Sequence, residues 1–254
     1  MKLRFSRRQP AEPLPAVRPA DLRLAVPWYL HPAENPEQWA ELMRQAQAGR
    51  IAFAVVNVAN GPGLADDPYY PGGLDALRQG GVPLHGYVDT DYGARPSAQV
   101  LEDISVWKER YDVEGVMFDR VSADPANLGY YKPIAAFARQ IGVEVLVGNP
   151  GVIPHQDYLE TFDVCCVFEN VDTVHRRLTT MRRPGDIPPE RLWHLVYDVP
   201  PGGFESVLER TASQGAALVF ATDRGGANPW CGLSAELLHE MDRLGIGARH
   251  STRA

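Results

Sequence analysis

The chain has 254 residues, of which 44% are hydrophobic and 22% are charged. This length and composition are typical of a single soluble α/β barrel domain with a sizeable core. The formal charge of −7 disfavours a nucleic acid or an anionic membrane as partner, because either would require a basic face.

The first 20 residues are basic and then proline-rich, which predicts a disordered arm that precedes the folded domain. This stretch contains no apolar run long enough for a signal peptide or a membrane span. We therefore expect a cytoplasmic protein as the sequence is written, and a secreted one if the true start lies upstream. The 3 cysteines match neither a disulfide framework nor the spacing of zinc ligands.

Apolar runs then recur along the chain at intervals that predict strands. They lie at Leu22–Pro27, Ile51–Val58, Leu84–Val88, Gly115–Phe118, Val143–Val147, Val164–Phe168, Leu192–Tyr197 and Ala217–Ala221. Helical patterns fall between most of them, at Pro36–Ala48, Gly73–Gln79, Ala98–Tyr111, Tyr130–Ile141, weakly at Val171–Met181, and at Phe204–Gln214 and Ser234–Leu244. We expect Ser97 and Ser234 to be helix N-caps and Gly142 to end a helix.

Strands that alternate with helices in this way predict βαβ units and a parallel sheet. Eight such units favour closure into a single (β/α)₈ TIM barrel, because a doubly wound open sheet needs fewer. The predicted barrel domain covers residues 21–246, and residues 247–254 are expected to form a flexible tail.

Carboxylates follow two of the predicted strands directly. Asp119 ends the VEGVMFDR segment, and Glu169 follows the apolar residues CCVF. Strand ends meet at one rim of such a barrel, where catalytic groups collect, and two carboxylates there favour acid/base chemistry such as glycoside cleavage. The same rim is expected to carry Tyr29, Asn57, Asp89, Asp91, Tyr92, Arg120, Asn149, Tyr197 and Asp198.

Other interpretations of these residues stay open. Asp119 could form a buried salt bridge with Arg120 or with another basic residue. Asp198 could be a turn or cap residue. His85 and His194 lie within predicted strands and are expected to be interior residues. No cofactor motif is present and no metal site is expected, and a Schiff-base lysine is disfavoured because no lysine lies at a strand end.

Seven segments in order resemble the spherulin-4-like proteins of spherulation-specific family 4. They are VPWYLHP, AFAVVNVANGPG, HGYVDTDYGARP, VEGVMFDRVS, VLVGNPGVIP, VCCVFEN and WHLVYDVP, and they extend over roughly residues 21–240. The resemblance implies a (β/α)₈ barrel related to hydrolases that cut α-1,4-linked N-acetylgalactosamine polymers. It implies catalytic roles for Asp119, the first residue of the family's Asp-Glu pair, and for Glu169, its later glutamate.

Arg120 stands where that family has the second acid of the pair, and it cannot transfer a proton in this role. The missing acid could come from Asp89, Asp91 or Asp198, substrate assistance by an N-acetyl group could replace it, or catalysis could be lost. The last case predicts a non-catalytic saccharide-binding barrel.

For the enzyme we expect retaining hydrolysis of a galactosamine-type glycan, with Glu169 as general acid/base and Asp119 as nucleophile or stabiliser of an oxazolinium-type intermediate. Carboxyls about 5 Å apart would favour this mechanism, and about 6.5–9.5 Å an inverting one. The expected partner is a carbohydrate, and the expected state a monomer or weak homo-oligomer.

Overall fold

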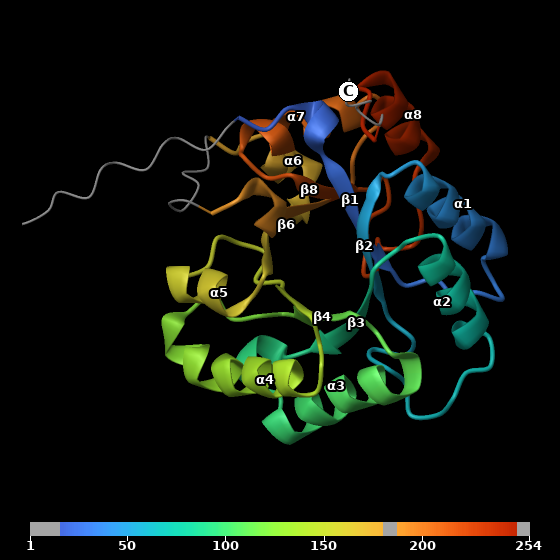
Figure 1. Cartoon of the computed structure of the whole chain (residues 1–254). Helices are drawn as coiled ribbons and strands as arrows, with labels where there is room; N and C mark the ends of the chain where they lie inside the picture. Colours follow the sequence, from blue (N-terminus) through green and yellow to red (C-terminus); the bar gives the residue numbers. More distant parts are fainter. Residues whose placement is uncertain (1–15, 180–186, 248–254) are drawn as a thin grey trace, which may run out of the picture.

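The computed structural model describes residues 16–179 and 187–247, which form a closed barrel with helices around it (Figure 1). Within these residues, eight parallel strands pair in chain order, and the last pairs with the first. They are β1 (Arg23–Trp28), β2 (Ile51–Val56), β3 (Leu84–Asp89), β4 (Gly115–Asp119), β5 (Val145–Gly148), β6 (Val164–Val171), β7 (Leu192–Tyr197) and β8 (Leu218–Ala221). The predicted (β/α)₈ barrel is confirmed.

Helices α1 to α7 connect successive strands, α8 follows the last strand, and together they cover the outside of the barrel. They are α1 (Pro36–Gln47), α2 (Tyr70–Gln79), α3 (Ser97–Tyr111), α4 (Leu128–Gln140), α5 (Gln156–Thr161), α6 (Asp172–His175), α7 (Phe204–Ser213) and α8 (Ala235–Arg243). Short 3₁₀ turns lie at η1 (Pro19–Asp21), η2 (Asp91–Gly93), η3 (Pro125–Asn127) and η4 (Pro189–Arg191). No helix in the described part of the chain combines the length and the apolar character needed to cross a membrane.

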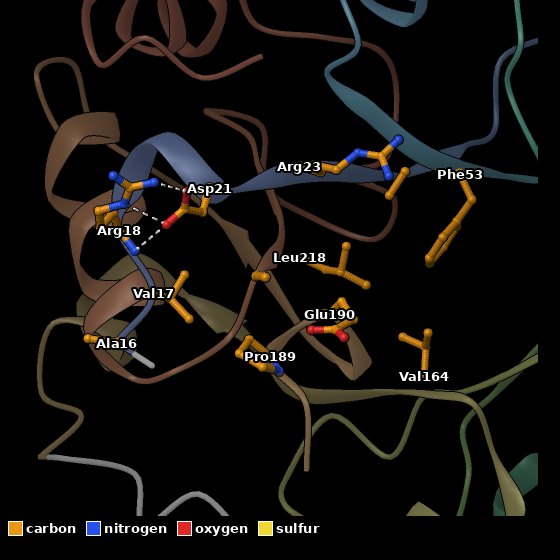
Figure 2. Close-up of a pocket in the computed structure, with 12 residues that line it drawn as sticks. Ala16, Val17, Arg18, Asp21, Arg23, Phe53, Val164, Pro189, Glu190 and Leu218 are labelled. Carbon is orange, nitrogen blue, oxygen red and sulfur yellow. Dashed lines mark hydrogen bonds and ion pairs between the residues drawn. The ribbon is translucent and has the colours of Figure 1, made fainter. Parts of the chain in front are cut away.

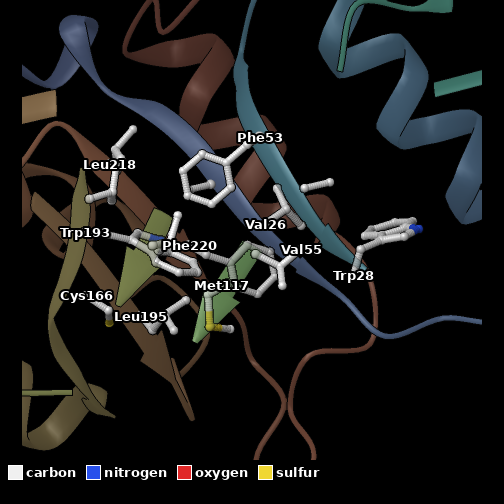
Figure 3. Packing of buried hydrophobic residues seen from close by; sticks show 14 of the residues in the cluster. Val26, Trp28, Phe53, Val55, Met117, Cys166, Trp193, Leu195, Leu218 and Phe220 are labelled. Atoms are coloured by element: carbon white, nitrogen blue, oxygen red, sulfur yellow. The ribbon is translucent and has the colours of Figure 1, made fainter. Parts of the chain in front are cut away.

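The strands read as continuous apolar runs because both of their faces are buried. One face packs against the helices and the other fills the barrel. In the interior, the Phe53 ring stacks on His85 with 4.4 Å between centroids, and Trp193 meets Phe53 edge-on at 5.5 Å. Figure 3 shows Phe53, Val55, Met117, Trp193, Leu195 and Phe220 gathered between the strands. The barrel is therefore a packed core, and a ligand has access to its ends alone.

Both histidines expected to be interior residues are buried. His85 lies inside the barrel against Phe53, and His194 lies on the face of β7 that packs against α6. His85 is 1% exposed and His194 0%, and burial lowers the pKa of each to about 3. Nδ1 of His194 lies 3.1 Å from Nε2 of His175 on α6. All three imidazoles are neutral at pH 7, since burial also lowers the pKa of His175 to about 4. Among the described residues, no three His, Cys, Asp or Glu side chains converge as metal ligands.

Several element boundaries differ from those expected. Helix α5 was not predicted, because its six residues are too few for a helical period. Ser97 is the first residue of α3 and Pro96 its N-cap, so the predicted cap is wrong. Ser234 is an N-cap residue but makes no side-chain capping bond. Gly142 ends α4 in the left-handed region (φ +87°), as predicted.

Some predicted segments lie partly outside the described residues. Of the arm expected over residues 1–20, residues 1–15 are outside, and residues 19–21 form η1. The segment Val171–Met181, expected to be a helix, lies within the described residues as far as residue 179. In that part the helix α6 has only four residues. The expected tail is outside from residue 248 onward.

Helix α3 packs closely on β3 because a glycine in the strand leaves room for an indole ring. A Cβ atom placed on Gly86 would lie 2.4 Å from the Trp107 ring. The Trp107 indole N–H donates to the carbonyl of Tyr87 at 2.8 Å. Gly86 therefore allows the contact that fixes α3 against the strand leading to Asp89.

We expect Gly86→Ala to lower the free energy of unfolding by about 1–3 kcal/mol, because the added methyl group overpacks the Trp107 ring. Urea denaturation of the purified protein measures this change. Gly72→Ala on α2 is the matched control, since nothing lies within 4 Å of its Cβ position. Alanine there should leave stability unchanged or raise it by about 0.5–1 kcal/mol. Equal stability of the two variants would contradict the packing account.

Candidate active site

A cavity of about 450 Å³ opens at the C-terminal end of the barrel. It lies where β4 to β7 end, next to η2 and the loop that follows β8. Its lining residues are Tyr92, Asp119, Arg120, Asn149, Pro150, Gly151, Val152, Glu169, Tyr197, Ala227 and Trp230. Six of the residues expected at the rim are among them, and these include both predicted catalytic carboxylates.

The two carboxylates come from different strands. Asp119 is the last residue of β4. Glu169 was expected just after its strand, but β6 continues to Val171. The pairing of β6 with β7 shifts between Cys166 and Phe168. An extra residue of this kind changes which face the following side chains occupy, and Glu169 after it lines the cavity.

A single amide group bridges the two carboxylates. Nδ2 of Asn149 donates to Oδ1 of Asp119 at 2.7 Å and to Oε2 of Glu169 at 2.5 Å. The backbone N–H of Gly151 donates to Oδ1 of Asn149 at 3.0 Å, which fixes the orientation of the amide. Since both bonds share one nitrogen, the two carboxylate oxygens are at most about 5 Å apart, the length of the two bonds end to end.

Burial changes the acidity of both carboxyl groups. Burial and the charge of Asp119 raise the pKa of Glu169 to about 7, although the Asn149 hydrogen bond opposes the shift. Burial also raises the pKa of Asp119, against hydrogen bonds from the Arg120 backbone, Tyr87 and Asn149. Asp119 thus has three donors that stabilise its charged form. The pair therefore combines an acid that keeps its proton near neutral pH with a better stabilised carboxylate.

Two tyrosines lie close to the carboxylates. The hydroxyl of Tyr87 donates to Oδ2 of Asp119 at 2.9 Å. The ring of Tyr29 meets that of Tyr87 edge-on at 5.5 Å. The pKa of Tyr29 is raised well above its usual value, first by burial and then by Asp119, Tyr87 and Glu169. Tyr29 therefore stays protonated next to the acids, although it does not line the cavity.

Arg120 binds two other acids and makes no pair with Asp119. Its Nε donates to Oδ1 of Asp89 at 2.8 Å and its Nη2 to Oδ2 of the same carboxylate, while Nη1 lies 3.1 Å from Oδ1 of Asp91. Burial raises the pKa of Asp89, but the Arg120 bonds outweigh it and the net shift is downward. The alternative of an Asp119–Arg120 salt bridge is therefore wrong, and Asp89 is a poor substitute for a missing proton donor.

Asn57 and Asp198 were expected at the rim but do not line the cavity. Oδ1 of Asn57 accepts from the backbone N–H of Gly61 at 2.8 Å and so closes a turn after β2. Asp198 has a left-handed backbone (φ 53°), and its N–H donates to the carbonyl of Arg224 at 3.0 Å. Its carboxylate packs against Gly225. Both residues shape loops.

Tyr87 and Trp230 were not among the residues expected at the rim. Tyr87 lies two residues before Asp89, so strand alternation could have placed both side chains on one face. Trp230 lies nine residues beyond the end of β8 in a loop without periodicity, and no signal marked it. Its ring meets that of Tyr197 edge-on at 6.0 Å. The two rings form one wall of the cavity.

A larger cavity of about 580 Å³ lies at the opposite end of the barrel. Its walls include residues at or near the starts of their strands, namely Arg23, Phe53, Val164 and Leu218 (Figure 2). Three of the charged groups drawn there have partners: Arg18 binds Asp21, and Nη2 of Arg23 donates to the carbonyl of Ile51. This mostly apolar cavity lacks the paired carboxylates of the C-terminal end.

Solved structures that resemble this fold include a protein of Aspergillus clavatus and a mannanase. Aspergillus clavatus Sph3 in complex with GalNAc has a TM-score of 0.77 and 24% identity, over 88% of this chain and 97% of that one. A GH113 β-1,4-mannanase has a TM-score of 0.50 and 12% identity, over 81% and 88%. At these identities the likeness establishes the shared barrel fold.

Comparisons of the sequence establish the family. Spherulin-4 of Physarum polycephalum is 30% identical over 152 residues, which cover 59% of this chain and 45% of that protein. The chain thus matches less than half the length of this curated relative. Residues 23–242 match the family described as Spherulation-specific family 4. Because this match extends over nearly the whole barrel, the chain belongs to spherulation-specific family 4.

Proposed function

We propose that the protein is a retaining glycoside hydrolase that cleaves galactosamine-type glycans with Asp119 and Glu169. The observation that carries the proposal is the pair of carboxylate oxygens held within about 5 Å by the Asn149 amide. Retaining enzymes keep their carboxyls about 5–5.5 Å apart, whereas inverting enzymes need about 6.5–9.5 Å to admit a water molecule. The family membership and the GalNAc bound by Sph3 support the choice of sugar.

The acidities of the two carboxyl groups support a different role for each. Glu169, with a pKa raised to about 7, is protonated at the start of the cycle and gives its proton to the glycosidic oxygen as the bond to the anomeric carbon breaks. Asp119 in its charged form attacks that carbon, or stabilises the oxazolinium ion that a substrate N-acetyl group forms there. Glu169 then removes a proton from the water molecule that releases the sugar.

The walls of the cavity suit a sugar ring. Tyr92, Tyr197 and Trp230 offer flat apolar surfaces, and Asn149 and the carboxylates offer polar groups. Sugars present both kinds of surface, with C–H groups on ring faces and hydroxyls at ring edges. Binding sites that combine aromatic surfaces with a few placed polar groups recognise such ligands.

Arg120 favours a second candidate function, a saccharide-binding barrel without hydrolysis. Arg120 stands beside Asp119 where the family resemblance implies an acid, and its charge is bound by Asp89 and Asp91. Such a protein would hold the same sugars in the same cavity. A hydrolysis assay separates the two functions.

We expect the wild-type protein to release reducing ends from α-1,4-linked oligosaccharides of galactosamine or N-acetylgalactosamine. Glu169→Gln and Asp119→Asn should each lower kcat/KM by about 10²–10⁴-fold, because each removes a group that transfers or balances charge in the transition state. Glu160→Gln, on the exposed surface of α5, is the matched control. NMR of the first product should show the α-anomer. The β-anomer would contradict the retaining mechanism, and full activity of Glu169→Gln would contradict the assignment.

We expect kcat/KM of the wild type to fall as pH rises through about 7, where Glu169 loses its proton. The Asn149 amide stabilises the charged form of Glu169 and so lowers its pKa. In Asn149→Ala the midpoint of this fall should move to higher pH, together with a loss of rate from poorer carboxylate alignment. pH–rate profiles of both proteins measure the shift. A move to lower pH would show that the amide does not act on Glu169 in this way.

Glu169→Gln should also be more stable than the wild type at alkaline pH. The pKa of Glu169 is about 7 in the folded protein against an ordinary 4.5, so the folded state binds the proton more tightly. Ionisation of Glu169 therefore costs no folding free energy below about pH 4.5 and the full amount above about pH 7, on the order of 3 kcal/mol. Urea denaturation at pH 5 and pH 8 should show a gain that grows with pH. Glu160→Gln should show no such gain.

A further inference from the structure

All three nitrogens of the Arg120 guanidinium have acidic partners at the end of β3 or in the turn after it. Nε and Nη2 bind both oxygens of Asp89, the last residue of β3, and Nη1 binds Asp91 in η2. A two-bond pairing of this kind fixes the plane of the guanidinium as well as its position. Arg120 thus joins the end of β4 to the turn that follows β3.

That turn has an unfavourable backbone conformation. Asp91 (φ 46°) and Tyr92 (φ 55°) both lie in the left-handed region, and so does Arg120 (φ 51°). Non-glycine residues stay in this region only where surrounding contacts hold them there. Here the N–H of Tyr92 donates to the carbonyl of Arg120 at 2.6 Å, and the hydroxyl of Thr90 donates to the same carbonyl at 2.9 Å.

The turn presents the Tyr92 ring at the mouth of the cavity. Tyr92 is 57% exposed, a high value for a large aromatic residue, and it lines the cavity together with Asp119 and Glu169. The guanidinium carbon of Arg120 lies over the ring, 5.8 Å from its centroid. A ring supported on one face by a cation leaves its other face for a ligand.

We propose that Arg120 is a positioning residue that holds Tyr92 as a platform for the apolar face of a sugar ring bound at the cavity mouth. This inference rests on the proposed function, since it names a subsite of the same glycan-binding cavity. It accounts for an arginine beside Asp119 without giving it a part in proton transfer. The substrate class follows: a glycan with at least one further ring beyond the bond that Asp119 and Glu169 act on.

The test is a double-mutant cycle of Arg120→Gln and Tyr92→Ala in the full chain, in the Glu169→Gln background. Isothermal titration with a tetrasaccharide of α-1,4-linked N-acetylgalactosamine gives Kd without turnover. Each single change should weaken binding by about tenfold, the effect of one lost aromatic contact. The double change should weaken it no further, because Arg120 acts through Tyr92. Arg44→Gln on α1, which removes the same charge from an exposed surface, is the control and should leave Kd unchanged.

Turnover of proteins that retain Glu169 separates positioning from catalysis. Arg120→Gln should raise KM for the tetrasaccharide by about tenfold and change kcat by less than about twofold. A loss of kcat at unchanged KM would overturn the proposal, as would additive losses of binding in the cycle or no binding by the Glu169→Gln parent. If the parent binds and the cycle is non-additive but the wild type does not hydrolyse the sugar, the hydrolase function fails and the platform stands.

Discussion

The hydrogen bonds from the Asn149 amide to Asp119 and Glu169 are the interaction on which the site depends. Two carboxylates in a buried site repel each other and lose the water that would solvate them. The amide supplies a donor to each and limits their separation. Strand order makes this possible, because Asn149 directly follows β5, which lies between the strands that carry the two acids. Alternate strands of a barrel contribute side chains to the same layer, and the loop of the middle strand reaches both.

Arg120 separates two groups of acids at the rim. Asp89 and Asp91 compensate its charge, and its guanidinium lowers the pKa of Asp89. Asp119 lies opposite Asp89 in the register of β3 and β4. It does not share the Arg120 guanidinium, and accepts hydrogen bonds from Tyr87, Asn149 and the backbone N–H of Arg120. Asp89 and Asp91 are thereby held in ion pairs with Arg120. Asp119 and Glu169 line the cavity, and the pKa of each is raised. Arg120, which stands where the family resemblance implies an acid, thus has its own ion pairs with Asp89 and Asp91.

The parts of the molecule that follow from local pattern could be predicted from the sequence. The apolar runs located all eight strands, and their ends placed Asp119, Asn149, Glu169 and Tyr197 at one rim. The parts that depend on pairing between distant residues could not be predicted. The shifted pairing of β6 with β7 leaves no signal in the residues VCCVFEN. The neighbour Asp119 was one possible partner of Arg120, but the guanidinium binds Asp89, 31 residues away. Trp230 reaches the cavity from an irregular loop, so no period could indicate it.

The two ends of the barrel show why the size of a cavity does not identify the site. The larger cavity has Phe53 and Leu218 in its wall, at the strand starts. The same Phe53 ring stacks on His85 and meets Trp193, so the packed interior closes that end off from the carboxylates. This packing also matters for chemistry. The pKa of Glu169 is raised because its carboxyl group is shielded from water. The apolar barrel interior, which includes Met117, Cys166 and Leu195, excludes water on the side away from the cavity. The stability of the barrel and the acidity of its catalytic candidate therefore have the same physical source.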